Sequence, residues 1–226
     1  MSMQTGPKIN RDGLILALDA ADLGSYPGAG TTWNDLSGNN NNGTLTNGPT
    51  FNVNNGGSVV FDGVDDYALL GSSVTLGNTF TINAFVKLAG SNSNSVIIGT
   101  NANGSDNWLS ITNDKIRAVC TEFADVNNVA TDGVTTLSYN TWYYLSMVVN
   151  VSTVTAYLNG ILDVTSTLPF PIANWNGNFT IGRRSTDYAT FYFYGNIANV
   201  TFYNRVLTAA EILQNYKALK PRFKLN

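Results

Sequence analysis

Histidine is absent from this sequence, so the commonest general base and metal ligand of enzymes is missing. Without histidine, neither a Ser-His-Asp triad nor a Cys-His pair can form in the chain. Cysteine occurs once, at Cys120, which excludes an internal disulfide and is interpreted as a small buried hydrophobic residue. These absences indicate a protein that is not an enzyme.

Charge is also scarce, since charged residues make up 12% of the 226 residues and the net charge is −3. No run of lysine or arginine occurs, so we expect no nucleic-acid partner. The apolar runs are too short to span a membrane, and residues 1–10 contain no apolar signal core. We therefore expect no membrane partner and no signal peptide.

The sequence does contain many short apolar runs with turn signals between them, which predict strands. The predicted strands cover residues 14–18, 59–61, 80–88, 96–98, 108–111, 116–120, 142–151, 154–158, 161–164, 179–181 and 197–203. Residues 81–87 alternate as if one face lay in a core, and residues 142–151 are apolar enough to be covered on both faces. Asn159-Gly160 predicts a tight hairpin. The pattern predicts an all-β fold, a two-sheet antiparallel jelly-roll sandwich.

One helix is expected near the end of the chain, because Thr208-Ala209-Ala210-Glu211 forms a capping box and Pro221 follows the apolar positions. Residues 34–49 read as a long polar loop. We expect one domain over residues 13–220, an N-terminal arm over residues 1–12 and a C-terminal tail over residues 221–226, both arms docking only in an assembly.

Several segments, in order, resemble a known family. They are Gly13-Leu-Ile-Leu-Ala-Leu-Asp19, Trp33-Asn-Asp-Leu-Ser-Gly38, Val60-Phe-Asp-Gly-Val-Asp-Asp-Tyr67, Phe80-Thr-Ile-Asn-Ala-Phe-Val-Lys87, Phe179-Thr-Ile-Gly182 and Phe202-Tyr-Asn-Arg-Val-Leu-Thr208. The set resembles the laminin-G-like branch of the concanavalin A-like lectin/glucanase superfamily. Its two ends resemble copies in virion proteins of tailed bacterial viruses. The resemblance implies a jelly roll that hosts lectins, adhesive modules, glucanases and structural domains.

Catalysis as in the glucanases of that superfamily implies a strand with paired glutamates. This chain has only Glu122 and Glu211, and Glu211 belongs to the capping box. An endoglycanase that uses two aspartates remains an alternative.

Metal binding is the next possibility that the resemblance raises. Asp62, Asp65 and Asp66 form an acidic cluster, which we interpret as a turn rather than a calcium site. Relatives bind calcium with acids near Asp106 and Asp187, but Arg183 and Arg184 stand beside them here and favour an Asp–Arg pair. Ala198 and Asn199 replace an acid of another family site. We therefore expect no metal and no cofactor.

The same loops still offer flat apolar faces and hydrogen-bonding groups, the mixture that binds sugars. The candidate ligand-binding residues are Asp106, Asn107, Trp108, Arg184, Asp187, Tyr188 and Tyr192. The alternative is that Trp108 and the aromatic residues of 188–194 pack in the core or in a subunit contact.

The function predicted from the sequence is a non-catalytic virion structural or adhesion protein, either capsid decoration or a fibre module, with possible binding of a cell-surface glycan. Its expected partners are other virion proteins and further copies of the chain, as a trimer, and its expected location is the virion, assembled in the host cytoplasm. A free-standing carbohydrate-binding lectin of cellular origin is the alternative.

Overall fold

Two antiparallel sheets make up most of the structure, a computed structural model that describes residues 8–90, 94–102, 105–121, 128–185 and 191–225. Sheet A contains β1 (Leu14–Asp19), β4 (Thr50–Asn52), β5 (Ser58–Asp62), β8 (Thr79–Leu88), β13 (Trp142–Asn150), β14 (Thr153–Leu158), β15 (Ile161–Thr167) and β18 (Tyr194–Tyr203). Sheet B contains β2 (Thr32–Trp33), β3 (Gly43–Thr46), β6 (Tyr67–Leu70), β9 (Ser95–Ala102), β10 (Ser105–Thr112), β11 (Lys115–Thr121), β12 (Asn128–Asp132) and β17 (Phe179–Ile181).

The smaller elements lie around this pair of sheets. They are the two-stranded ribbon of β7 (Val74–Gly77) and β16 (Trp175–Gly177), the helix α1 (Ala209–Leu219), and the short helices η1 (Asn54–Gly56) and η2 (Lys220–Phe223). None of the described helices is long and apolar enough to cross a membrane.

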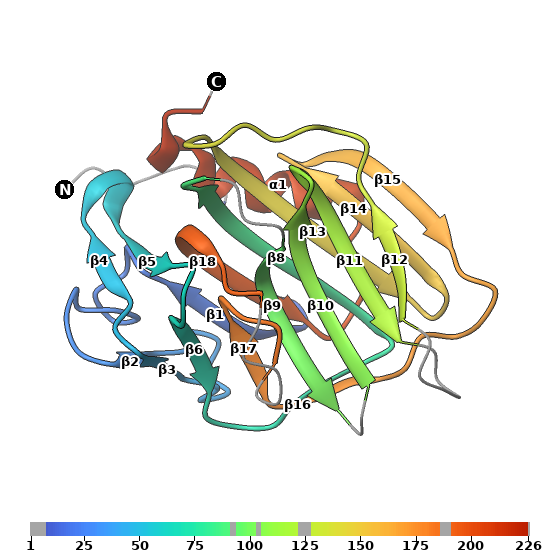
Figure 1. Ribbon diagram of the computed structural model, residues 1–226, viewed down its shortest axis with the longest axis horizontal. Helices are drawn as coiled ribbons and strands as arrows, with labels where there is room; N and C mark the ends of the chain where they lie inside the picture. Colours follow the sequence, from blue (N-terminus) through green and yellow to red (C-terminus); the bar gives the residue numbers. More distant parts are fainter. Residues whose placement is uncertain (1–7, 91–93, 103–104, 122–127, 186–190, 226) are drawn as a thin grey trace.

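The strand order is β15-β14-β13-β8-β18-β5-β4 in sheet A, with β1 also paired to β18, and β12-β11-β10-β9-β17-β6-β3-β2 in sheet B. In Figure 1 the strands β9, β10 and β11 of sheet B lie in front of β8 and β13 of sheet A. Half of the strand pairs in the two sheets join strands that are not consecutive in the chain, as in a jelly roll, and the predicted fold class is confirmed.

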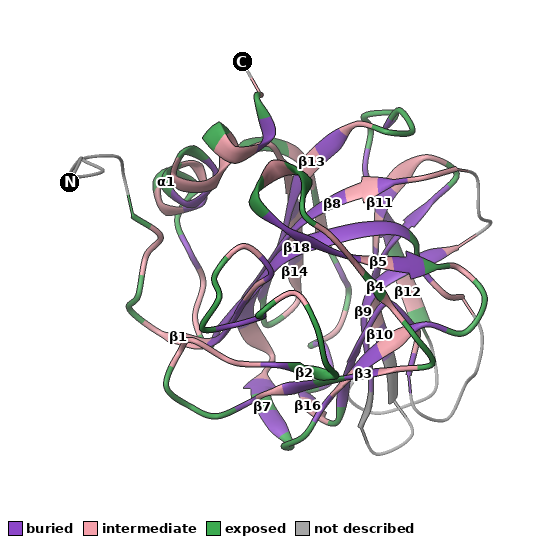
Figure 2. Cartoon of the chain, turned by 90° about the vertical axis from the view of Figure 1, so that its left-hand side faces the viewer, coloured by how far each residue is buried: buried purple, intermediate pink, exposed green. Residues whose placement is uncertain are grey.

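The main core fills the space between the two sheets, and Figure 2 shows the buried residues gathered in the central strands. Aromatic pairs join the sheets, since Phe179 of β17 lies 5.1 Å from Phe202 of β18, measured between ring centroids. Phe80 of β8 packs on Trp175 of β16 at 5.0 Å. Cys120 is buried in this core, as predicted.

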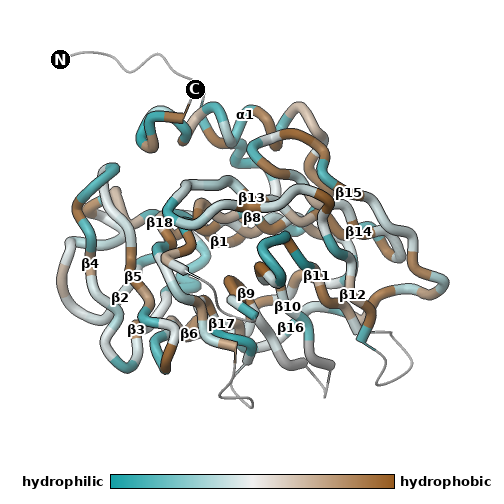
Figure 3. The backbone as a smooth tube through the Cα atoms, turned by 45° about the horizontal axis from the view of Figure 1, so that its top comes forward, coloured by the Kyte–Doolittle hydropathy of each residue, from teal (hydrophilic) through white to brown (hydrophobic). Residues whose placement is uncertain are grey.

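The outer face of sheet A is covered as well, by α1 and η2, which lie above β13 and β8 in Figure 3. The prediction that β8 has one face in a core is therefore incomplete. Ile82, Ala84 and Val86 fill the main core, while Phe85 on the opposite face packs in a second cluster with Tyr216 and Phe223. Buried Asn83 of that face donates to the Thr201 hydroxyl at 3.0 Å. The apolar strand β13 is covered on both faces, as predicted.

Both ends of the described chain pack on this domain, in contrast to the arms that the sequence predicted. The backbone amide of Asn10 donates to the side-chain carbonyl of Asn215 at 2.7 Å, and its carbonyl accepts from the Tyr203 hydroxyl at 2.8 Å. Arg222 contacts both carboxylate oxygens of Asp19 at 2.8 Å, and Phe223 is only 5% exposed. These contacts join residues about 200 positions apart, which a local pattern does not show.

The polar loop predicted over residues 34–49 contains a strand, β3, and is tied to β1 by Asp35. One carboxylate oxygen of Asp35 accepts from the amides of Ala17 and Ser37, both at 2.8 Å, and the other accepts from the amide of Asn41 at 3.0 Å. The loop is thus a fixed part of the fold.

The two local predictions are confirmed. Asn159 and Gly160 have φ angles of 53° and 80°, the positive values that the hairpin between β14 and β15 requires. The helix α1 begins with the Thr208–Glu211 capping box.

Candidate functional site

The outer face of sheet B carries two aromatic side chains, Trp108 and Tyr67. In β10, Leu109 and Ile111 point into the core, so Trp108 and Ser110 point outward. In β6, Ala68 and Leu70 point into the core, so Tyr67 points outward and is half-buried. Three strand spacings separate β6 from β10, which places the two rings roughly 14 Å apart across the sheet.

The chain that leaves β17 crosses this face. Gly182 turns it with a φ of 87°, and its amide donates to the Ile97 carbonyl at 2.9 Å. Gly99 of β9 lies beneath it, because a Cβ atom at Gly99 would lie 1.7 Å from the carbonyl oxygen of Arg184. The missing side chain of Gly99 therefore allows residues 183–184 to lie directly on the sheet.

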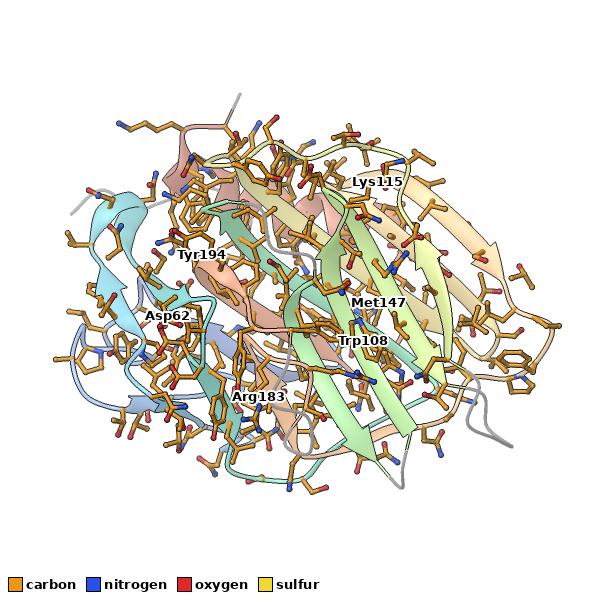
Figure 4. The ribbon with its side chains drawn as sticks, viewed as in Figure 1. Asp62, Trp108, Lys115, Met147, Arg183 and Tyr194 are labelled. Atoms are coloured by element: carbon orange, nitrogen blue, oxygen red, sulfur yellow. The ribbon has the colours of Figure 1, made fainter. Side chains whose placement is uncertain are left out.

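The two arginines of this crossing segment stack on the two aromatic rings. The guanidinium carbon of Arg183 lies 4.0 Å from the Tyr67 ring centroid, and that of Arg184 lies 4.5 Å from the Trp108 ring centroid. Arg184 also lies 5.4 Å from the ring of Phe191, a residue with a φ of 60° that is strained for a bulky side chain. Figure 4 labels Trp108 and Arg183 on this part of sheet B.

The structure brings together two of the predicted ligand-binding residues, Trp108 and Arg184. Tyr192 follows Phe191 on the same segment and is half-buried. Asp187 and Tyr188 lie outside the described residues, and so does the side chain of Asp106, whose backbone belongs to β10. The predicted Asp–Arg pair, of Arg183 or Arg184 with one of those acids, therefore also lies outside the described residues.

Asn107 differs from the prediction. Its side chain is fully buried, and its carbonyl oxygen accepts from the backbone amide of Thr121 at 2.7 Å. Because Asn107 alternates with Trp108 along β10, it points to the opposite side of the sheet from the tryptophan. Asn107 is therefore not part of the outer face of sheet B.

Sequence reasoning missed Tyr67 as a partner of Arg183. The available signal was the alternation of Tyr67 and Leu69 with the core residues Ala68 and Leu70, which marks Tyr67 as outward-facing. Nothing local in the sequence places Arg183 over that ring, since β6 and β17 become neighbours only by sheet pairing.

In the acidic cluster of Asp62, Asp65 and Asp66, one carboxylate oxygen from each residue lies within 4.8 Å of the other two. Asp62 accepts from the amide of Val64 at 2.8 Å, and Asp66 accepts from the amide of Asp62 at 3.0 Å. Gly63 between them has a φ of 78°. Burial, and then the charges of Asp62 and Asp65, raise the pKa of Asp66. The carboxylates thus cap a turn, as the sequence indicated.

Asn199 and Ala198 are both buried, and the side-chain amide of Asn199 donates to the Leu18 carbonyl at 3.0 Å. Asn199 lines a pocket of about 400 Å³ with Leu14, Asp19, Leu36 and Leu219. Burial raises the pKa of Asp19, and the charge of Arg222 opposes this rise. The guanidinium of Arg222 thus supplies the positive charge next to Asp19.

Two further side chains with reactive groups, Cys120 and Glu211, have structural roles in the described chain. Burial raises the pKa of the Cys120 thiol to about 12, which keeps it protonated and unreactive. The hydrogen bond from Arg205 lowers the pKa of Glu211 to about 2, and Glu211 also caps α1. Glu122 lies outside the described residues.

Comparison with known proteins adds a family. The sequence model of the concanavalin A-like lectin/glucanases superfamily matches residues 62–213, more than half of the chain. The chain belongs to this superfamily. The match covers β6 to β18, and with them Tyr67, Trp108 and the crossing segment, whereas β2 and β3 of sheet B precede it. The resemblance seen in the sequence is confirmed at this level.

Solved structures with a similar fold include the binding domain of Paraclostridial Mosquitocidal Protein 1, with a TM-score of 0.70, 14% identity and 91% of this chain covered. The binding domain of botulinum neurotoxin serotype D has a TM-score of 0.68 at 16% identity, and the match covers 91% of this chain. This chain spans about half of each toxin domain, 52% in both cases.

Domain 4 of AbnA, an extracellular arabinanase from Geobacillus stearothermophilus, was solved in complex with arabinotriose. It gives a TM-score of 0.68 at 18% identity, and the match covers 90% of this chain and 98% of that domain. At these identities the likeness shows the fold. No curated protein matches the chain in sequence.

Proposed function

We propose that this chain is a non-catalytic glycan-binding adhesion domain, and that its ligand lies on the outer face of sheet B between Trp108 and Tyr67. The observation that carries the proposal is the stacking of Arg184 on Trp108, 4.5 Å from guanidinium carbon to ring centroid. An aromatic ring held beside a planar guanidinium offers a sugar an apolar face and fixed hydrogen-bond donors at one place.

The rigidity of this arrangement supports the proposal. Gly99 and Gly182 hold the crossing segment on the sheet, so the arginines are positioned before any ligand arrives. Preorganised side chains lose little conformational entropy on binding, which favours affinity.

The fold supports the same class of function. One similar structure is a domain of an arabinanase in complex with arabinotriose, and others are binding domains of toxins. The absence of histidine and the capping role of Glu211 favour binding without catalysis.

The proposed location is the virion of a tailed bacterial virus, with the chain as a trimeric decoration or fibre module. The likeness of the chain's two ends to virion copies supports this placement, and the scarcity of surface charge leaves little repulsion between copies. Light scattering of the purified chain and binding to purified particles test this part. A chain that is monomeric and does not bind purified particles would favour the alternative function, a free-standing cellular lectin.

A glycan array tests the binding function. We expect the wild-type chain to bind at least one class of immobilised glycan, and Trp108→Ala and Arg184→Gln to lose that binding by about tenfold or more. Arg117→Gln is the matched control, because Arg117 also lies on sheet B but is already paired with Asp132.

Circular dichroism checks that each variant is folded. We expect Trp108→Ala to keep the fold, since its ring is only half-buried on the outer face. Folded wild-type protein that binds no glycan, or folded variants that bind as the wild type does, would refute the proposal.

A further inference from the structure

Arg183 is an unusual arginine within the described chain. Its side chain is stacked on Tyr67, and the residue is only 8% exposed. Its Nε atom is fully buried and has no hydrogen-bond partner. By contrast, Arg117 is paired with Asp132, Arg205 with Glu211 and Arg222 with Asp19. Arg183 thus keeps a positive charge that the described carboxylates do not neutralise.

The nearby acids do not supply the missing partner. Asp66 directly precedes Tyr67 in the chain, yet no ion pair within 4.0 Å joins Arg183 to Asp62, Asp65 or Asp66. Those carboxylates accept from backbone amides of their own turn instead. The charge of Arg183 is therefore available to a ligand.

A largely buried guanidinium without an acceptor costs stability, because its lost hydration is not replaced. A bound carboxylate replaces it best, since its two oxygens match the parallel N–H groups of arginine. The ring of Tyr67 holds the guanidinium plane in place at 4.0 Å, so its orientation is fixed in advance.

The surroundings of Arg183 fit a sugar that bears this carboxylate. Thr46 lies opposite Tyr67 in the pairing of β3 with β6, and Thr44 lies opposite Leu69, so two threonines flank the aromatic ring on the outer face. Their hydroxyl groups can exchange hydrogen bonds with sugar hydroxyls. On the side of Tyr67 away from β3, the site continues to Arg184 and the Trp108 ring on which it stacks.

From this geometry we infer that Arg183 receives the carboxylate of an acidic sugar, so that the ligand of this face is a glycan containing a uronic acid or a sialic acid. The inference rests on the proposed function and names the class of its ligand. Arg183 is the residue that selects the acid, while Trp108 and Arg184 hold the neighbouring sugar.

The test compares two matched pairs of probes by calorimetry on the full chain. The first pair is oligogalacturonate and its methyl ester, and the second is sialyllactose and lactose. Members of the first pair share the same sugar ring, and methyl esterification removes the charge of the carboxylate. A response confined to one pair identifies the type of acid. We expect the wild type to prefer one acidic probe over its neutral partner by about tenfold or more.

Variants assign this preference to a residue. Arg183→Gln should bind the acidic and neutral probes alike, and Arg183→Lys, which keeps the charge but loses the paired N–H groups, should show a smaller preference than the wild type. Arg117→Gln should keep the full preference. The comparison within wild-type protein stands even if a variant fails to fold.

Four outcomes separate the two proposals. Equal wild-type affinity for acidic and neutral probes, or a full preference in folded Arg183→Gln, overturns the inference while glycan binding stands. Wild-type binding to neutral glycans alone on the array does the same. Folded protein that binds none of the array glycans and none of the four probes overturns the proposed function itself.

Discussion

The ring of Phe223 lies 4.2 Å from the ring of Phe85, with an angle of 18° between their planes. Phe223 belongs to η2 at the end of the chain, whereas Phe85 lies at the middle of β8 on the outer face of sheet A. Trp142 packs on the ring of Phe223 as well, at 4.6 Å between ring centroids. The end of the chain therefore closes the second core cluster.

Replacement of Phe223 by alanine should lower the free energy of unfolding by about 3–5 kcal/mol, because a buried aromatic ring is removed and leaves a cavity. Urea denaturation followed by circular dichroism measures this loss. Lys224→Ala, one residue further on, is the control and should change stability by less than about 0.5 kcal/mol. Equal stability of the two variants would show that the second cluster does not depend on η2.

Gly99→Ala should displace the crossing segment from sheet B, because the new Cβ would meet the Arg184 carbonyl oxygen at 1.7 Å. We expect a loss of roughly 1–3 kcal/mol of stability, together with a loss of glycan binding. Gly71→Ala is the control, since the nearest atom to its Cβ would be the Asn42 carbonyl oxygen at an ordinary 3.6 Å. Gly99→Ala protein with unchanged stability and binding would contradict the arrangement of residues 183–184.

Glu211 should make the stability of the fold depend on pH in the acid range. Its pKa is about 2 in the folded chain, against an ordinary value of 4.5, mainly because Arg205 donates hydrogen bonds to it. The ionised carboxylate therefore stabilises the fold at neutral pH, and this contribution is lost as pH falls from about 4.5 toward 2.

Glu211→Gln isolates this effect, because glutamine preserves the shape of the capping box without the charge. Urea denaturation at pH 7, 4.5 and 3 should show the variant to be less stable at pH 7, with a difference from the wild type that shrinks toward pH 3. A constant difference across the three pH values would argue against the pairing of Glu211 with Arg205.

Calcium should leave the melting temperature unchanged. The oxygens of Asp62 and Asp66 already accept hydrogen bonds from the backbone of their turn, and Arg222 lies against Asp19. Melting curves in excess EDTA and in millimolar calcium check this prediction. A rise of many degrees with calcium would reveal a metal site, since an ion bound only by the folded state raises its stability.

The sequence predicted the elements whose signals are local. The runs in residues 80–88, 142–151 and 197–203 became β8, β13 and β18, because each buries apolar side chains on at least one face. Short strands such as β3 and β16 escaped prediction, since they contain few apolar residues.

The candidate site was predictable only in part. Trp108 and the pair Arg183-Arg184 stood out in the sequence as a ring and two cations near polar loops. The burial of Asn107 could not be read from the sequence, because its bond to the Thr121 amide joins two neighbouring strands.

The sequence by itself determined the jelly-roll class, the Asn159-Gly160 hairpin and the start of α1, since turn chemistry, capping and alternation act between residues close in the chain. Only the tertiary structure decided which rings the arginines meet. Strand β17 pairs with β6 on one side and with β9 on the other, so Arg183 falls over Tyr67 and Arg184 over Trp108. Those neighbours are fixed by the order of strands in sheet B, which depends on the burial of the whole core.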